Sequence, residues 1–180
     1  EDVPPTPAPS LEDSQPAASP PFEPAPAYAE TYAETYAEPE EPFADVACPH
    51  LRALLERQTE ELPRAISELE ARGEKTSHWA RWCFPTDLCG TNEPPPATCV
   101  APHLAATLLE RGPVEIWRRC LELVCDLSEA RGDLVLPKAD HGRVAFFVAF
   151  WERLDATPAW LYAVLTRLAA ARAPVLTRQL

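Results

Sequence analysis

Residues 141–155 read HGRVAFFVAFWERLD, and the middle of this stretch is apolar at every position. A helix that is apolar all round is buried on every side, so this segment is predicted to be the central helix of a folded domain. Its apolar run, Val144–Trp151, has eight residues, whereas a membrane span needs roughly 18 or more. The stretch therefore indicates a core helix and predicts no membrane span in the chain.

Segments on the N-terminal side of this stretch carry apolar residues at helical spacing. Leucines recur through 51–62, Pro63 is expected to open a separate helix that stops at Gly73, and 104–110 is a short predicted helix. A longer helix is predicted from about 113 to 130. It carries one apolar stripe, formed by Val114, Trp117, Leu121, Val124 and Leu127.

A last helix is predicted to begin at Thr157-Pro158, since an apolar periodicity of helical spacing follows this pair. No segment of the chain alternates apolar and polar residues as a half-buried strand does. The predicted fold class is therefore all-α, a bundle of amphipathic helices around a central hydrophobic helix.

The first 45 residues differ sharply in composition from the rest of the chain. They hold eleven Asp or Glu, no Lys or Arg, and eleven of the 22 prolines. Such a segment cannot bury enough apolar surface to offset its ordering entropy. We predict a disordered acidic, proline-rich tail over 1–45 and one helical domain over 46–180. The repeats at Tyr28, Tyr32 and Tyr36 are interpreted as part of a low-complexity spacer, and tyrosines that serve as kinase substrates beside acidic residues are the alternative.

Charge and motif content narrow the function classes. Outside the tail the chain has seventeen acidic and sixteen basic residues. The sequence shows no basic patch, so nucleic acid is not predicted as a partner. The chain contains no GxSxG, no phosphate-binding loop, no GxGxxG and no HExxH. We therefore expect no enzyme and no cofactor.

Six cysteines leave two interpretations open. An even number permits disulfides, but no CxxC is present and the four histidines do not form a zinc pattern with the cysteines. Thiols in the core or in loops are favoured over a secreted disulfide framework, because cysteine is commonly buried. No metal site is predicted.

Two segments resemble homology motifs of the Bcl-2 family. His141 to Phe150 resembles the Bcl-2 homology 1 motif, in which Gly-Arg opens the central helix and aromatic residues follow. Ile66 to Glu74 resembles a degenerate Bcl-2 homology 3 (BH3) segment, with Leu, three residues, Gly and an acid. Their order is similar to that in the divergent viral Bcl-2 proteins of poxviruses and adenoviruses. The usual glycine after the aromatic run is replaced by Trp151.

The resemblance implies a Bcl-2-like bundle that binds amphipathic BH3 helices of pro-apoptotic Bcl-2 proteins in a surface groove. Arg143 would hold a partner's aspartate, and Gly142 would permit close helix approach. The other implied site residues either line the groove or belong to the core: Leu121, Val124, Val144 and Phe147.

The implied outcome is inhibition of apoptosis in the host cytoplasm, with mitochondria reached through the partners. Some viral relatives block inflammatory signalling instead, and the residues do not decide between the two outcomes. A different family is the alternative. Residues 150–168 resemble the fourth and fifth helices of caspase-recruitment domains, so a death-fold interaction domain within 97–180 would modulate innate immune signalling.

Overall fold

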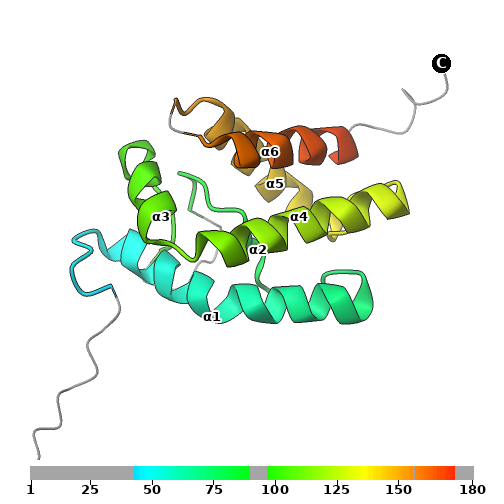
Figure 1. The fold of residues 1–180 in the computed structure, drawn as a ribbon, viewed down its shortest axis with the longest axis horizontal. Coiled ribbons are helices and arrows are strands. Elements are labelled where there is room, and N and C mark those ends of the chain that lie inside the picture. Colours follow the sequence, from blue (N-terminus) through cyan, green and yellow to red (C-terminus); the bar gives the residue numbers. More distant parts are fainter. Residues whose placement is uncertain (1–42, 90–96, 156, 173–180) are drawn as a thin grey trace, which may run out of the picture. The chain divides into compact units, whose positions relative to one another are not determined.

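The described part of the chain is built from helices that follow one another through short connections. The computed structural model describes residues 43–89, 97–155 and 157–172, and these contain no strand. The predicted all-α class is confirmed. In chain order the elements are α1 (Pro49–Arg72), α2 (Ala80–Cys83), the 3-10 helix η1 (Pro102–Leu104), α3 (Ala105–Arg111), α4 (Val114–Arg131), α5 (Lys138–Glu152) and α6 (Ala159–Arg172) (Figure 1).

Helix α1 is a single helix of 24 residues with Pro63 inside it. The predicted break at Pro63 is therefore wrong, although proline inside a helix costs roughly 3 kcal/mol. The apolar stripe of α1 continues in phase across the proline, from Leu55 and Leu62 to Leu69, and all three side chains are buried. Pro63 itself is exposed. Packing of the continuous stripe against α4 offsets the lost backbone hydrogen bond.

Glycine ends two of the long helices. Gly73 follows α1 with φ 69° and Gly132 follows α4 with φ 80°. Left-handed backbone is open to glycine at little steric cost, and each glycine N–H donates to a carbonyl of the last turn, that of Leu69 or Ser128. The predicted helix stop at Gly73 is confirmed.

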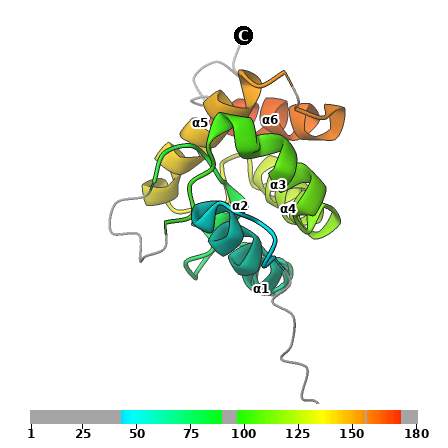
Figure 2. The same cartoon turned by 90° about the vertical axis from the view of Figure 1, so that its left-hand side faces the viewer.

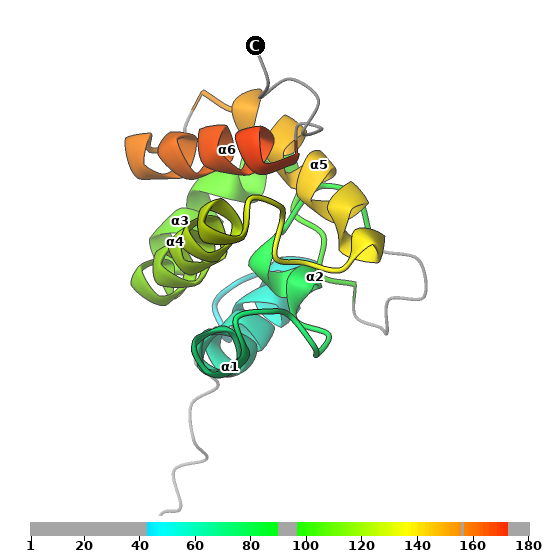
Figure 3. The ribbon, with the colours of Figure 1, turned by 90° about the vertical axis from the view of Figure 1, so that its right-hand side faces the viewer.

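Helix α4, and not α5, is the central element of the bundle. It lies between α1 and α6 (Figure 1, Figure 3) and also packs against α2 and α3. Helix α5 lies at the edge of the bundle, beside α6 and away from α1 (Figure 2). The predicted burial of α5 on every side is wrong, because the side chain of Phe146 is 52% exposed.

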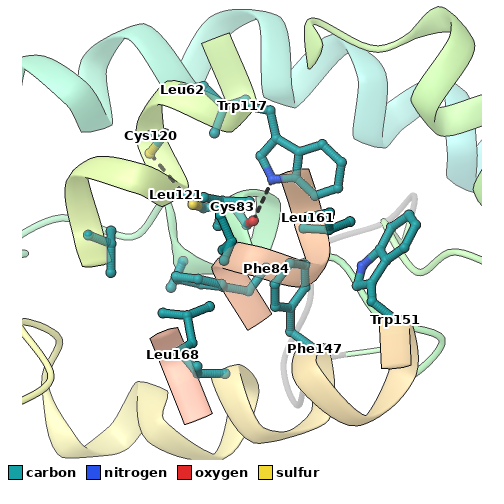
Figure 4. Packing of buried hydrophobic residues seen from close by; sticks show 14 of the residues in the cluster. Leu62, Cys83, Phe84, Trp117, Cys120, Leu121, Phe147, Trp151, Leu161 and Leu168 are labelled. Atoms are coloured by element: carbon teal, nitrogen blue, oxygen red, sulfur yellow. Dashed lines mark hydrogen bonds between the residues drawn. The ribbon is translucent and has the colours of Figure 1, made fainter. Parts of the chain in front are cut away.

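Large aromatic side chains join α4 to α5 inside the core. Trp117 of α4 contacts Phe147 and Trp151 of α5, with ring centroids 6.3 and 5.6 Å away. The indole of Trp117 donates a hydrogen bond of 2.8 Å to the carbonyl of Cys83, so its polar atom is satisfied inside the core (Figure 4). The indole of Trp151 similarly donates to the carbonyl of Pro85.

Packing of the domain begins slightly before the predicted boundary at residue 46. Phe43 packs against the core cluster, and the Asp45 carboxylate forms two hydrogen bonds with Arg111, of 2.5 and 2.9 Å. Residues 43–45 therefore belong with the helical domain. The rest of the predicted tail, with its tyrosine repeats, lies outside the described residues.

Candidate functional site

Four of the six predicted site residues are core residues. These four residues are Leu121, Val124, Val144 and Phe147, and the exposed fraction of each is 0%. No partner can therefore contact their side chains in this structure. Of the two roles left open for them, groove lining and core packing, their burial supports core packing. The physical reason is that α4 turns Leu121 and Val124, and α5 turns Val144 and Phe147, toward the interior and not toward a surface groove.

Arg143 lies near the start of α5 and holds the segment that follows α2. Its guanidinium donates hydrogen bonds to three backbone carbonyls: Nε to Phe84 at 2.8 Å, one terminal nitrogen to Leu88 at 2.7 Å, and the other to Arg81 at 3.2 Å. Bonds from a charged donor are stronger than neutral ones. Arg143 therefore fixes the path of residues 81–88 across α5, a structural role that the sequence did not indicate.

A surface pocket surrounds the Gly142-Arg143 pair. Its volume is about 460 Å³, and it is lined by Arg81, Leu88, Cys89, Ala139, Asp140, Gly142, Arg143 and Phe146. Gly142 is exposed, and a Cβ atom added there would meet no atom within 4 Å. Two predicted site residues are thus brought together in one accessible hollow, at the place where α5 begins.

The apolar surface of this pocket comes from two residues that sequence reasoning missed. Phe146 is 52% exposed and Leu88 is 47% exposed, the largest exposed fractions among the large hydrophobic side chains of the described residues. Phe146 was expected in the core because every position near it is apolar. Helical spacing gives no signal that separates it, because Phe150 lies four positions further on, on the same face of α5, and is buried.

An ion pair fixes the rim of the pocket. Lys75, from the connection after α1, lies 2.8 Å from the carboxylate of Asp140 in the first turn of α5. The Lys75 side chain is 7% exposed and also lies 5.7 Å from the ring centre of Trp79. An acidic residue in the first turn suits the positive end of the helix dipole.

Glu68 organises the connection between α1 and α2, which carries Lys75. Its carboxylate accepts hydrogen bonds from the backbone of Thr76 and Ser77 and from the indole of Trp79. Partial burial raises the pKa of Glu68, but these donors outweigh it and bring the pKa to about 2. The connection therefore keeps a charged carboxylate as its centre near neutral pH.

The cysteines of the described residues are free thiols. Cys83, Cys120 and Cys125 are buried, and the sulfur atoms of Cys83 and Cys120 lie 3.5 Å apart (Figure 4). Burial raises the pKa of Cys83 well above its ordinary value and that of Cys125 to about 12. Within the described ranges, no group of three or more His, Cys, Asp or Glu side chains is arranged to bind a metal ion.

Among the residues that the structure describes, no helix combines the length and the apolar character that a membrane crossing requires. Comparison of the chain with models of protein families, with curated protein sequences and with solved structures finds no match. The interpretation of the pocket therefore depends on its own chemistry and on the motif at Gly142-Arg143.

Proposed function

We propose that this chain is a viral Bcl-2-like inhibitor of apoptosis that binds amphipathic BH3 helices of pro-apoptotic Bcl-2 proteins. The observation that carries the proposal is the pocket at the start of α5, where Gly142 and Arg143 lie beside exposed Phe146 and Leu88. The binding surface is this pocket, in place of the groove implied by the sequence. The chain would act in the host cytoplasm by sequestering such helices.

The chemistry of the pocket suits an amphipathic helix. Phe146 and Leu88 offer apolar surface for the apolar face of the partner, where aromatic side chains commonly supply most of the binding energy. Arg81 and Arg143 supply positive charge for an acidic residue. A carboxylate that reaches Arg143 would compete with the backbone carbonyls that it already binds. The affinity for the partner helix therefore depends more on the apolar contacts than on an ion pair between its carboxylate and Arg143.

The alternative, a death-fold domain within 97–180, requires that segment to have a core of its own. In the structure, Leu62 and Leu69 of α1 belong to the same core cluster as Trp117, Phe147 and Leu168. Helix α1 also packs along α4. Because α1 is part of this core, we favour the helix-binding function over a caspase-recruitment function.

The test is a fluorescence titration of the whole chain with labelled BH3 peptides. Phe146→Glu places a charge on the apolar wall and should weaken binding at least ~10-fold. Tyr162→Glu is the matched control, because Tyr162 is a similarly exposed aromatic residue (42%) on α6, and it does not line the pocket. Wild-type protein that binds no peptide, or equal losses in both variants, would contradict the proposal.

A further inference from the structure

Two buried thiols lie in contact where α2 meets α4. The sulfur atoms of Cys83, the last residue of α2, and Cys120 of α4 are 3.5 Å apart (Figure 4), and both residues have an exposed fraction of 0%. A disulfide bond holds its two sulfur atoms at about 2.05 Å. The sulfurs therefore need to approach by only about 1.5 Å, which rotation of both side chains by a few tens of degrees can supply.

The backbone around this pair of thiols is held in place by other contacts. The indole of Trp117 donates a hydrogen bond of 2.8 Å to the carbonyl of Cys83. Trp117 precedes Cys120 by three positions on α4, so both side chains lie on the same face of that helix. The backbone N–H of Cys83 also donates to the carbonyl of Trp79 at 3.1 Å. The fold thus holds the two thiols against each other independently of any bond between the sulfurs.

Two further cysteines have different neighbours. The sulfur of Cys125, also on α4, lies 3.9 Å from the carbonyl oxygen of Val164 on α6. The sulfur of Cys99 lies 3.4 Å from Nδ1 of His50. The geometry therefore favours a bond between the thiols of α2 and α4 that are already in contact over a bond that involves either of these two cysteines.

We propose that Cys83 and Cys120 are a disulfide site, which closes when the chain folds in the presence of a disulfide oxidant such as oxidised glutathione. The thiolate of one cysteine attacks a glutathione sulfur, forms a mixed disulfide and releases one glutathione thiolate. The thiolate of the second cysteine attacks the protein sulfur of the mixed disulfide, forms the bond between the two cysteines and releases the second glutathione. The two protein sulfurs supply two electrons, and the protons that the cysteines lose end on the two glutathione thiols. This inference does not rest on the proposed function.

Burial affects the rate at which this bond forms differently from its stability. In the folded chain both thiols are shielded from an oxidant, and burial raises the pKa of Cys83 well above its ordinary value, so little attacking thiolate is present. The bond should therefore form mainly during folding, before the core closes. Once formed, it joins two residues 37 positions apart, which restricts the unfolded chain and stabilises the fold. It also ties to α4 the segment 81–88, which Arg143 holds against α5.

The test refolds the denatured, reduced chain in a mixture of reduced and oxidised glutathione, in which thiol exchange can sample every pairing. Remaining thiols are then alkylated, and the chain is digested with trypsin without reduction. A second protease that cuts after acidic residues separates Cys83 from the next cysteine at Asp87, and Cys120 from the next cysteine at Glu122. The expected cross-linked product joins the peptide 82–87 to the peptide 120–122.

We expect this product to be the main cross-link, and the linked chain to melt roughly 10 °C above the reduced chain. Cys120→Ala, treated in the same way, should show neither the cross-link nor the gain in melting temperature. Cys125→Ala removes another buried thiol of α4 and should retain both, and circular dichroism checks that each variant folds. The cross-link map of the wild-type chain decides the question even if a variant fails to fold. Absence of the cross-link in wild type, a main cross-link to Cys125, or a linked chain that melts no higher than the reduced chain would each overturn the proposal.

Discussion

Replacement of Arg143 by alanine removes three hydrogen bonds that hold residues 81–88 against α5. Net contributions of bonds to charged groups are roughly 1.5–3 kcal/mol each. The bond to Leu88 is exposed and the other two are only partly buried, so solvent reduces the sum. We expect Arg143→Ala to lower the free energy of unfolding by about 2–4 kcal/mol, a large part of the roughly 5–15 kcal/mol that stabilises a typical domain.

The assay is urea unfolding followed by tryptophan fluorescence, which reports on the buried Trp117 and Trp151. With a slope of about 1.5–2 kcal/mol per molar urea, the midpoint should fall by roughly 1–3 M. Arg153→Ala is the matched control. Arg153 reaches the same segment through an ion pair with Asp87, but its side chain is 51% exposed, so its loss should cost under ~1 kcal/mol.

Equal midpoints for wild type and Arg143→Ala would refute the structural role of this arginine. Arg143→Lys adds a second check, because one ammonium group cannot reproduce the fork of the guanidinium. We expect lysine to recover less than half of the lost stability. A full recovery by lysine would show that positive charge alone, and not the three directed bonds, fixes the segment.

Three further predictions test the core, the α1–α2 connection and the thiols. Phe147→Ala should lower the free energy of unfolding by roughly 3–5 kcal/mol and Phe146→Ala by under ~1 kcal/mol, because only the Phe147 side chain is fully buried. Urea unfolding measures both losses, and equal losses would contradict the orientation of α5. The pKa of Glu68 falls from 4.5 to about 2 on folding, so its stabilisation is complete above pH 4.5 and is lost as the pH falls toward 2. Glu68→Gln should therefore flatten the acid side of the stability profile in thermal melts across this range, and an unchanged profile would remove Glu68 as its cause. The buried thiols of Cys83, Cys120 and Cys125 should react with an alkylating reagent only when the protein unfolds. An alkylation time course with peptide mass mapping measures this, and fast modification of any of the three in native protein would refute their burial.

Periodicity predicted the helices of the domain well because it reports directly on burial. The stripe from Val114 to Leu127 gave α4, and Thr157-Pro158 marked the start of α6. The predicted helix break at Pro63 was wrong. The free-energy cost of a proline in a helix is local, whereas the packing of α1 on α4 that offsets this cost involves residues about fifty positions away. Sequence spacing carries no information on that compensation.

Two of the predicted site residues lie at the surface and four lie in the core, and partner binding at the surface pair stays a prediction. The Gly142-Arg143 pair does line a surface pocket. The aromatic run after it could not be divided into core and surface by composition, because Phe146 and Phe147 are chemically identical and differ only in the side of α5 that they occupy. The contribution of Leu88 depends on a segment between helices, whose path is set by Arg143 and not by a periodic pattern.

The central place of α4 has a consequence for synthesis of the chain. The apolar face of α1 is covered by α4, yet Arg131, the last residue of α4, follows Arg72 by 59 positions. At roughly 5–20 residues per second, a ribosome needs about 3–12 s to make this stretch. During that interval the stripe of α1 lacks α4, the helix against which it packs most extensively. The nascent chain therefore offers a window of several seconds in which a holdase chaperone can bind the first half of the domain.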